Sequence, residues 1–168
     1  MSVVKLDLTL SFQDAEQKAL FPLKQSQLKK IVGVVFKELK SSAELEETVK
    51  LVGAPSSIGV YVCDDFEIRQ MQIRYKNLKR ATDVLSFCTR DDPNNDRSGY
   101  LGDIVVSVET VIRNAKRYKR PVLEEYRRVF IHSVLHLLGF EHVGVSAARR
   151  NRMRKIEKRV LGLIKKSL

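Results

Sequence analysis

Apolar residues in this chain repeat at two different intervals, and no other feature of the sequence limits the possible folds as strongly. Leu6 to Phe12 alternates apolar and polar residues, which is typical of a half-buried β-strand. Residues 25–40 place apolar side chains three and four positions apart, which predicts an amphipathic helix. Both repeats within 168 residues predict an α+β protein with a single domain, residues 1–168.

The same two repeats divide the rest of the chain into further strands and helices. Strands are predicted at Ser57–Cys63, Thr82–Phe87 and Asp103–Val108, helices at 65–75, 109–119, 121–138 and 146–167, and an exposed loop at Arg90–Gly99. The buried side of the last helix is expected to hold Met153, Ile156, Val160, Leu163 and Ile164. We therefore expect a mixed β-sheet of about four strands flanked by helices, in a strand order that the pattern does not predict.

Positive charge is concentrated in two places. Residues 146–168 contain nine lysines and arginines and one acid, Glu157, so they carry +8 of the formal net charge of +11. A second basic cluster consists of Arg69, Arg74, Lys76, Lys79 and Arg80. Such clusters favour a polyanion, because each neutralised phosphate releases condensed counterions. A strongly acidic partner protein, or helix faces that are simply solvated, would explain the same charge.

Two absences indicate where the protein acts. No apolar run approaches the roughly 18 residues that a membrane span needs, and the N-terminal residues lack the apolar segment of a signal peptide. Cys63 and Cys88 lie far apart without CxxC spacing, which favours two reduced thiols over one disulfide. We expect a cytoplasmic protein without a membrane partner.

All three histidines lie in the segment HSVLHLLGFEH, as His132, His136 and His142. Residues four apart share a helix face, so His132 and His136 can aim two imidazoles at one point. Gly139 can adopt a left-handed conformation that ends the helix and turns the chain so that His142 returns as a third ligand. Three imidazoles leave one tetrahedral position for water, which is the pattern of catalytic zinc, although imidazole also suits nickel, copper and iron. We predict one zinc ion on the long helix and its following turn.

The spacing HxxxHxxGxxH is also that of the metzincin proteases. Those enzymes place a glutamate directly after the first histidine as the general base, and this chain has Ser133 there. A serine hydroxyl is not a base near neutral pH. A metzincin-like metalloprotease therefore stays an alternative that the sequence disfavours.

Three segments together resemble one known family. HSVLHLLGFEH resembles the HGxLHLLGxxH motif of the YbeY endoribonuclease family, MQIRYKNLKRATDVLSF is similar to its LNxxYRxxDxPTDVLSF segment, and LGDIVVSVE is similar to its LGDI strand. The resemblance covers the chain from residue 56 onward. It implies a metal-dependent, single-strand-specific endoribonuclease that acts in ribosomal RNA maturation, at the 3′ end of the small-subunit rRNA, and in ribosome quality control. It also implies zinc on His132, His136 and His142 and the small ribosomal subunit as a partner.

This chain departs from the family pattern next to the expected active site. The family arginine that is implicated in activity corresponds to Lys76, which keeps the charge but lacks the planar fork that grips a phosphate. Arg74 is the expected substitute, with Arg80 a further candidate. The residues predicted to contact RNA are Arg74, Lys79, Arg80, Arg149, Arg150 and Arg152.

Two questions stay open at this stage. The chain could be a ribosome-assembly factor without catalysis, in which case the zinc is structural. If it is an enzyme, either water or the RNA 2′-hydroxyl could attack the phosphate.

Asp83 or Ser86 could form a hydrogen bond to the RNA. A turn aspartate and a buried strand serine are the simpler interpretations of these two residues. The sequence does not predict an oligomeric state.

Overall fold

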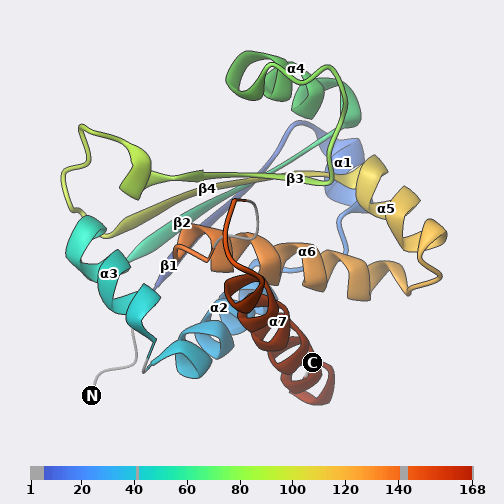
Figure 1. The fold of residues 1–168 in the computed structure, drawn as a ribbon. Helices are drawn as coiled ribbons and strands as arrows, with labels where there is room; N and C mark the ends of the chain where they lie inside the picture. Colours follow the sequence, from blue (N-terminus) through green and yellow to red (C-terminus); the bar gives the residue numbers. More distant parts are fainter. Residues whose placement is uncertain (1–5, 41, 141–143, 168) are drawn as a thin grey trace.

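A four-stranded sheet of mixed direction runs through the molecule (Figure 1). The computed structural model describes residues 6–40, 42–140 and 144–167. The strands are β1 (Asp7–Phe12), β2 (Ser57–Cys63), β3 (Val84–Cys88) and β4 (Tyr100–Ser107), in the order β1-β2-β4-β3. β1 and β4 both run parallel to β2, whereas β3 runs antiparallel to β4. The predicted mixed sheet of four strands is therefore confirmed.

The two central strands are apolar along most of their length because both faces of the sheet are covered. Val60 and Ile104, which lie opposite each other on β2 and β4, belong to the larger core. Cys63 and Val105 point to the other face and join a smaller core with Ile68. Because successive side chains of a strand point to opposite faces, the same strands contribute to a separate core on each face of the sheet.

Helices cover the two faces unequally (Figure 1). On one side lie α2 (Gln25–Leu39), α6 (Val122–Leu137) and α7 (Ala147–Ser167), and on the other side lies α4 (Asp65–Lys76). α2 and α6 pack on the strands, and α7 packs on α2 and α6. The chain also forms α1 (Ala15–Leu20), α3 (Ala43–Val52) and α5 (Val108–Arg117). No helix in the described part of the chain is both long and apolar enough to cross a membrane.

Several details differ from the sequence predictions. α1, α3 and a 3-10 turn at Thr89–Asp91 were not predicted. The six residues of α1 and the three of the 3-10 turn are too few for a helical repeat to stand out. The last strand begins earlier than expected, at Tyr100, and Val108 already belongs to α5. Leu163, expected on the buried side of α7, is 41% exposed.

Candidate functional site

His132 and His136 lie one turn apart on α6 and face the same point. Their Nε2 atoms are 3.0 Å apart, and the two rings are nearly perpendicular, at 81°, with centroids 4.5 Å apart. Two nitrogen ligands on one tetrahedral zinc ion lie about 3.3 Å apart, given Zn–N bonds of about 2.0–2.1 Å. Both side chains are half-buried. The pair therefore fits two ligands of one metal ion.

α6 ends as the sequence predicts, at Gly139. Its φ of +94° is one that other residues rarely adopt, and its N–H donates to the His136 carbonyl at 2.9 Å. The next N–H, of Phe140, donates to the Leu135 carbonyl at 3.0 Å. These two bonds form a Schellman motif, which satisfies the last carbonyls of the helix and turns the chain away from its axis.

The third predicted ligand, His142, lies outside the described residues. Among residues 6–40, 42–140 and 144–167, no three histidine, cysteine or acidic side chains come close enough together to hold a metal ion. The three-histidine site therefore stays a prediction, for which the geometry of the first two imidazoles is suitable.

A cleft of about 690 Å³ opens beside the two histidines, between α6 and β3. β3 is the edge strand of the sheet, and the connection from α4 forms the rest of the wall. The lining residues are Gln72, Lys76, Leu78, Arg80, Thr82, Asp83, Val84, Leu85, Ser86, Cys88, Asp91, Arg128, Val129, His132 and His136. Two segments that are far apart in the sequence, residues 72–91 and 128–136, thus meet around the histidine pair.

The cleft carries both signs of charge. Lys76, Arg80 and Arg128 supply three cations to its lining, and Asp83 and Asp91 supply two carboxylates. Arg128 and Asp91 were not predicted from the sequence. Arg128 precedes His132 by four residues on α6, so its helical spacing was a signal that could have identified it.

Arg128 is held in place by Glu125, which is fully buried. Its Nε and Nη2 donate to Glu125 Oε1 at 3.1 and 2.6 Å, and Arg120 Nη1 donates to Oε2 at 3.0 Å. Burial alone would raise the pKa of Glu125, but the hydrogen bonds and charges of the two arginines outweigh it and lower that pKa. Arg128 also approaches Asp83 to 3.8 Å, so the carboxylates fix the guanidinium at the cleft wall.

The predicted RNA-binding residues fall into three groups. Arg80 lines the cleft, as does Lys76, the predicted catalytic residue, whereas Arg74 and Lys79 are exposed but are not part of its lining. Arg149 is exposed on α7.

The other two predicted α7 arginines make contacts within the protein. Arg150 Nη1 donates to the Val145 carbonyl at 2.7 Å. Arg152 pairs with Glu44 of α3 at 2.7 Å. These two contacts fasten the start of α7 to its surroundings.

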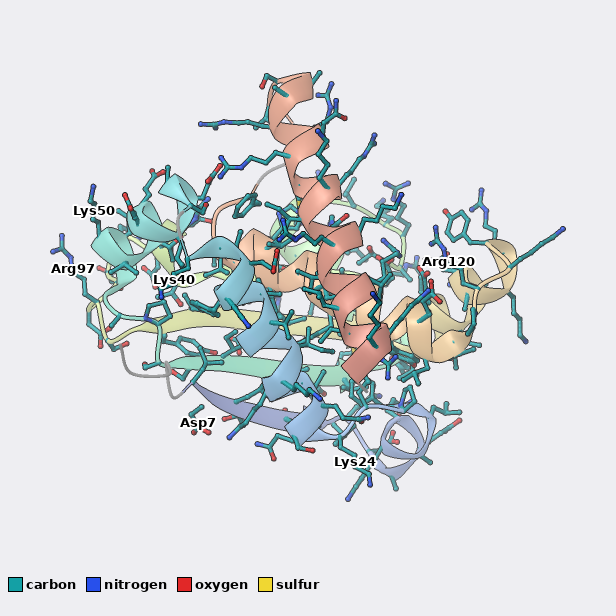
Figure 2. All side chains as sticks on the ribbon, turned by 90° about the horizontal axis from the view of Figure 1, so that it is seen from below. Asp7, Lys24, Lys40, Lys50, Arg97 and Arg120 are labelled. Carbon is teal, nitrogen blue, oxygen red and sulfur yellow. The ribbon has the colours of Figure 1, made fainter. Side chains whose placement is uncertain are left out.

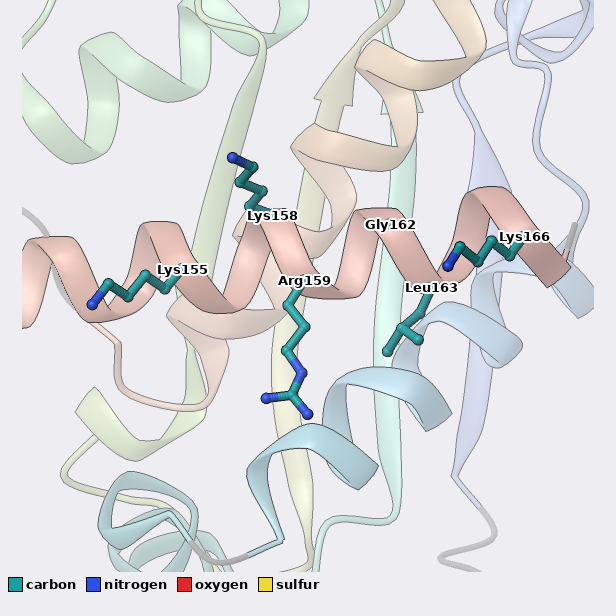
Figure 3. Close-up of a pocket in the computed structure, with 6 residues that line it drawn as sticks. All are labelled: Lys155, Lys158, Arg159, Gly162, Leu163 and Lys166. Atoms are coloured by element: carbon teal, nitrogen blue, oxygen red, sulfur yellow. The ribbon is translucent and has the colours of Figure 1, made fainter.

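The outer surface of α7 is basic along its length (Figure 2). A shallow hollow of about 440 Å³ is lined there by Lys155, Lys158, Arg159, Gly162, Leu163 and Lys166 (Figure 3). In Figure 3, Arg159 points toward α2, where it pairs with Glu38 at 2.6 Å. This surface is a second concentration of positive charge, separate from the cleft lining.

Comparison with known proteins supports the resemblance read from the motifs. The family model described as "Endoribonuclease YbeY" matches residues 11–165, and so begins well before residue 56. A protein of that name from Heliobacterium modesticaldum is 36% identical over 124 residues, which are 66% of this chain and 72% of the relative. Another from Thermodesulfovibrio yellowstonii is 33% identical over 142 residues, 83% of this chain and 86% of the relative.

A solution structure of a Thermotoga maritima protein is also similar, at 22% identity with a TM-score of 0.49, over 95% of this chain and 93% of that one. The family model spans most of the chain, and the second relative is matched over most of its own length. With its three motifs inside the matched region, this chain belongs to the YbeY endoribonuclease family.

Proposed function

We propose that this protein is a zinc-dependent endoribonuclease that cuts single-stranded RNA during ribosomal RNA maturation and ribosome quality control. The observation that carries the proposal is the convergence of the His132 and His136 Nε2 atoms beside a cleft with three cations in its lining. Membership of a family whose members are named endoribonucleases supports the reaction. The small ribosomal subunit is the proposed partner, and the cytoplasm the proposed location.

His132, His136 and His142 would hold the zinc ion. Imidazole nitrogens are ligands that zinc accepts readily, and the spacing of the first two Nε2 atoms is close to that of two ligands on one ion. The chemistry that bound zinc supplies is Lewis-acid activation of water and of a phosphoryl oxygen. Cys88 Sγ donates to the His136 carbonyl at 3.4 Å, which ties this helix turn to β3 at the edge of the cleft.

The chain's own cations would bind and orient the RNA. Lys76 and Arg80 approach the cleft from the α4 side, and Arg128 approaches it from α6, so a phosphate between them would be neutralised from two directions. Nε and Nη2 of Arg128 donate to Glu125, so Arg128 would supply charge at the wall and its remaining Nη1 donor rather than a bidentate grip on the phosphate. β3 pairs only with β4 among the described strands, so its outer edge can also meet a nucleotide.

The basic surface of α7 would track the RNA backbone outside the cleft. Arg149 and the lysines of the hollow, Lys155, Lys158 and Lys166, are exposed there. Contacts of this kind recognise phosphates and carry no sequence information, so we expect weak sequence preference from α7.

The metalloprotease alternative gains no support from the structure. Ser133 is fully buried, and its hydroxyl donates to the Val129 carbonyl at 2.9 Å. The position where a metzincin places its general base therefore points into the protein and carries no carboxylate.

The test incubates purified protein with a labelled single-stranded RNA, with and without a chelator, beside His136→Ala. We expect cleavage by the wild type only, and its recovery when zinc is restored to the chelated protein. Circular dichroism of His136→Ala checks that the domain is folded. Cleavage that survives both the chelator and the substitution would overturn the proposal. A folded, zinc-binding protein that never cleaves RNA would favour the assembly factor.

Charge variants locate the RNA path. Lys76→Ala and Arg80→Ala should each lower kcat/KM by about ten-fold or more, because each removes a cation from the cleft. Lys50→Ala, on the exposed surface of α3, is the matched control and should leave cleavage unchanged. A 2′,3′-cyclic phosphate on the product would indicate attack by the RNA 2′-hydroxyl, and its absence would indicate attack by water.

A further inference from the structure

The single acidic residue of α7 lies at a position where the helical repeat calls for an apolar side chain. Met153, Val160 and Ile164 are buried and Ile156 is half-buried, all on the side of α7 that packs on the protein. Glu157 falls on the same side, four residues after Met153 and three before Val160. A carboxylate on the packed side of a helix costs free energy unless it has a polar partner. The group that Glu157 contacts therefore indicates why a carboxylate stands at this position.

That partner is the first histidine of the cleft. Glu157 Oε1 is in hydrogen-bond contact with His132 Nδ1, and the two side chains are 18% and 24% exposed. A carboxylate only accepts hydrogen bonds, so the imidazole proton sits on Nδ1 and is donated to Glu157. The other nitrogen, Nε2, then presents its lone pair towards His136 Nε2, 3.0 Å away. This is the tautomer that ligation through Nε2 requires.

We propose that Glu157 is a positioning residue, which fixes the ring of His132 and its tautomer so that Nε2 is kept for the metal ion. The inference rests on the proposed function, because it assigns Glu157 a role at the same site. A histidine that donates its second N–H to a carboxylate is also a more basic ligand, and loss of such a partner typically weakens metal binding 10–100-fold.

The contact depends on how α7 is docked. Glu124 of α6 pairs with Lys165 of α7 at 2.7 Å, in the same helix interface but without a histidine. Glu124→Gln is therefore a matched control: it removes a carboxylate and an ion pair between α6 and α7, and it leaves His132 and Glu157 in place.

The test measures zinc binding by full-length protein in competition with a chromophoric chelator. We expect the zinc affinity of Glu157→Ala to fall about 10–100-fold, that of Glu157→Gln to fall less, and that of Glu124→Gln to stay within about two-fold of the wild type. Urea unfolding of the metal-free proteins checks that each variant is folded. If Glu157→Ala does not fold, Glu157→Gln decides the question, because its side chain has the same size without the charge.

A second readout follows the tautomer directly. Long-range ¹H–¹⁵N spectra of the metal-free protein should show the His132 proton on Nδ1 in the wild type and in Glu124→Gln, and a mixture of tautomers in Glu157→Ala. Unchanged zinc affinity in a folded Glu157 variant would overturn this inference and leave the proposed function standing. A wild-type protein that binds no zinc would overturn both.

Discussion

Replacing Glu125 tests how much its ion pairs with Arg120 and with Arg128, which lies at the wall of the cleft, stabilise the protein. Glu125 is fully buried, and it accepts hydrogen bonds from Arg120 and Arg128, whose side chains are 40% and 29% exposed. The substitution Glu125→Gln keeps the size of the side chain, removes the negative charge and replaces one acceptor oxygen by a donor. The amide nitrogen cannot accept from an arginine, so one hydrogen bond between charged groups, which contributes about 1.5–3 kcal/mol, is lost.

We therefore expect Glu125→Gln to lower the free energy of unfolding by about 2 kcal/mol at pH 7. The folded-state pKa of Glu125 lies below the ordinary glutamate value of 4.5, so its contribution to the free energy of unfolding is fully present above about pH 4.5. As the pH falls through the folded-state pKa, Glu125 in the wild type takes up its proton and the contribution is lost. The difference in the free energy of unfolding between the wild type and Glu125→Gln should therefore become smaller as the pH falls.

The assay is urea unfolding followed by circular dichroism, at pH 7 and at several values from pH 5 down to pH 3. Glu124→Gln is the control, because the neighbouring Glu124 is 24% exposed and pairs with the half-exposed Lys165, which predicts a loss below about 1 kcal/mol. A difference for Glu125→Gln that is below 0.5 kcal/mol at pH 7, or that is the same at pH 7 and pH 3, would refute the reasoning.

Two further predictions concern other parts of the fold. Gly139→Ala should destabilise the protein by about 1–2 kcal/mol in urea unfolding, because a side chain strains the left-handed backbone and meets the Arg90 guanidinium; a neutral effect would contradict the assigned helix end. Burial raises the pKa of the Cys63 thiol to about 12, so iodoacetamide at pH 8 should leave it unmodified in native protein and modify it after unfolding, as read by mass spectrometry.

The long elements of the fold could be predicted from the sequence because each carries a repeat of its own. The repeat at residues 25–40 matches α2, and the apolar run at Ser57–Cys63 is β2. α3 was not predicted although it is as long as α5, because its apolar residues Val49 and Leu51 are each 40% exposed and do not mark one buried face. The order β1-β2-β4-β3 depends on which strands pair across long stretches of chain, and no local pattern encodes that choice.

Only part of the candidate site could be predicted from the sequence. The spacing of His132 and His136 was sufficient to predict that their imidazoles face the same point. Both lie on one helix, where a separation of four residues places two side chains on the same face. Asp91 and Glu157 could not be assigned to the site, since their places depend on how separate segments dock. The predicted role of Arg74 as a substitute for Lys76 also has weaker support, because Arg80 and Arg128 line the cleft and Arg74 does not.

The strand order also affects how the chain can fold while it is being synthesised. β1 is made first, but among the described strands its one partner is β2, whose residue Ser57 lies opposite Asp7. The larger core is then closed by α6 and α7, which are made last. A nascent chain therefore exposes the part of that apolar face that α6 and α7 will cover until its C-terminal third has left the ribosome. The contact between His132 and Glu157 joins the two last helices, so a prematurely ended chain would have the cations of the α4 side without this contact.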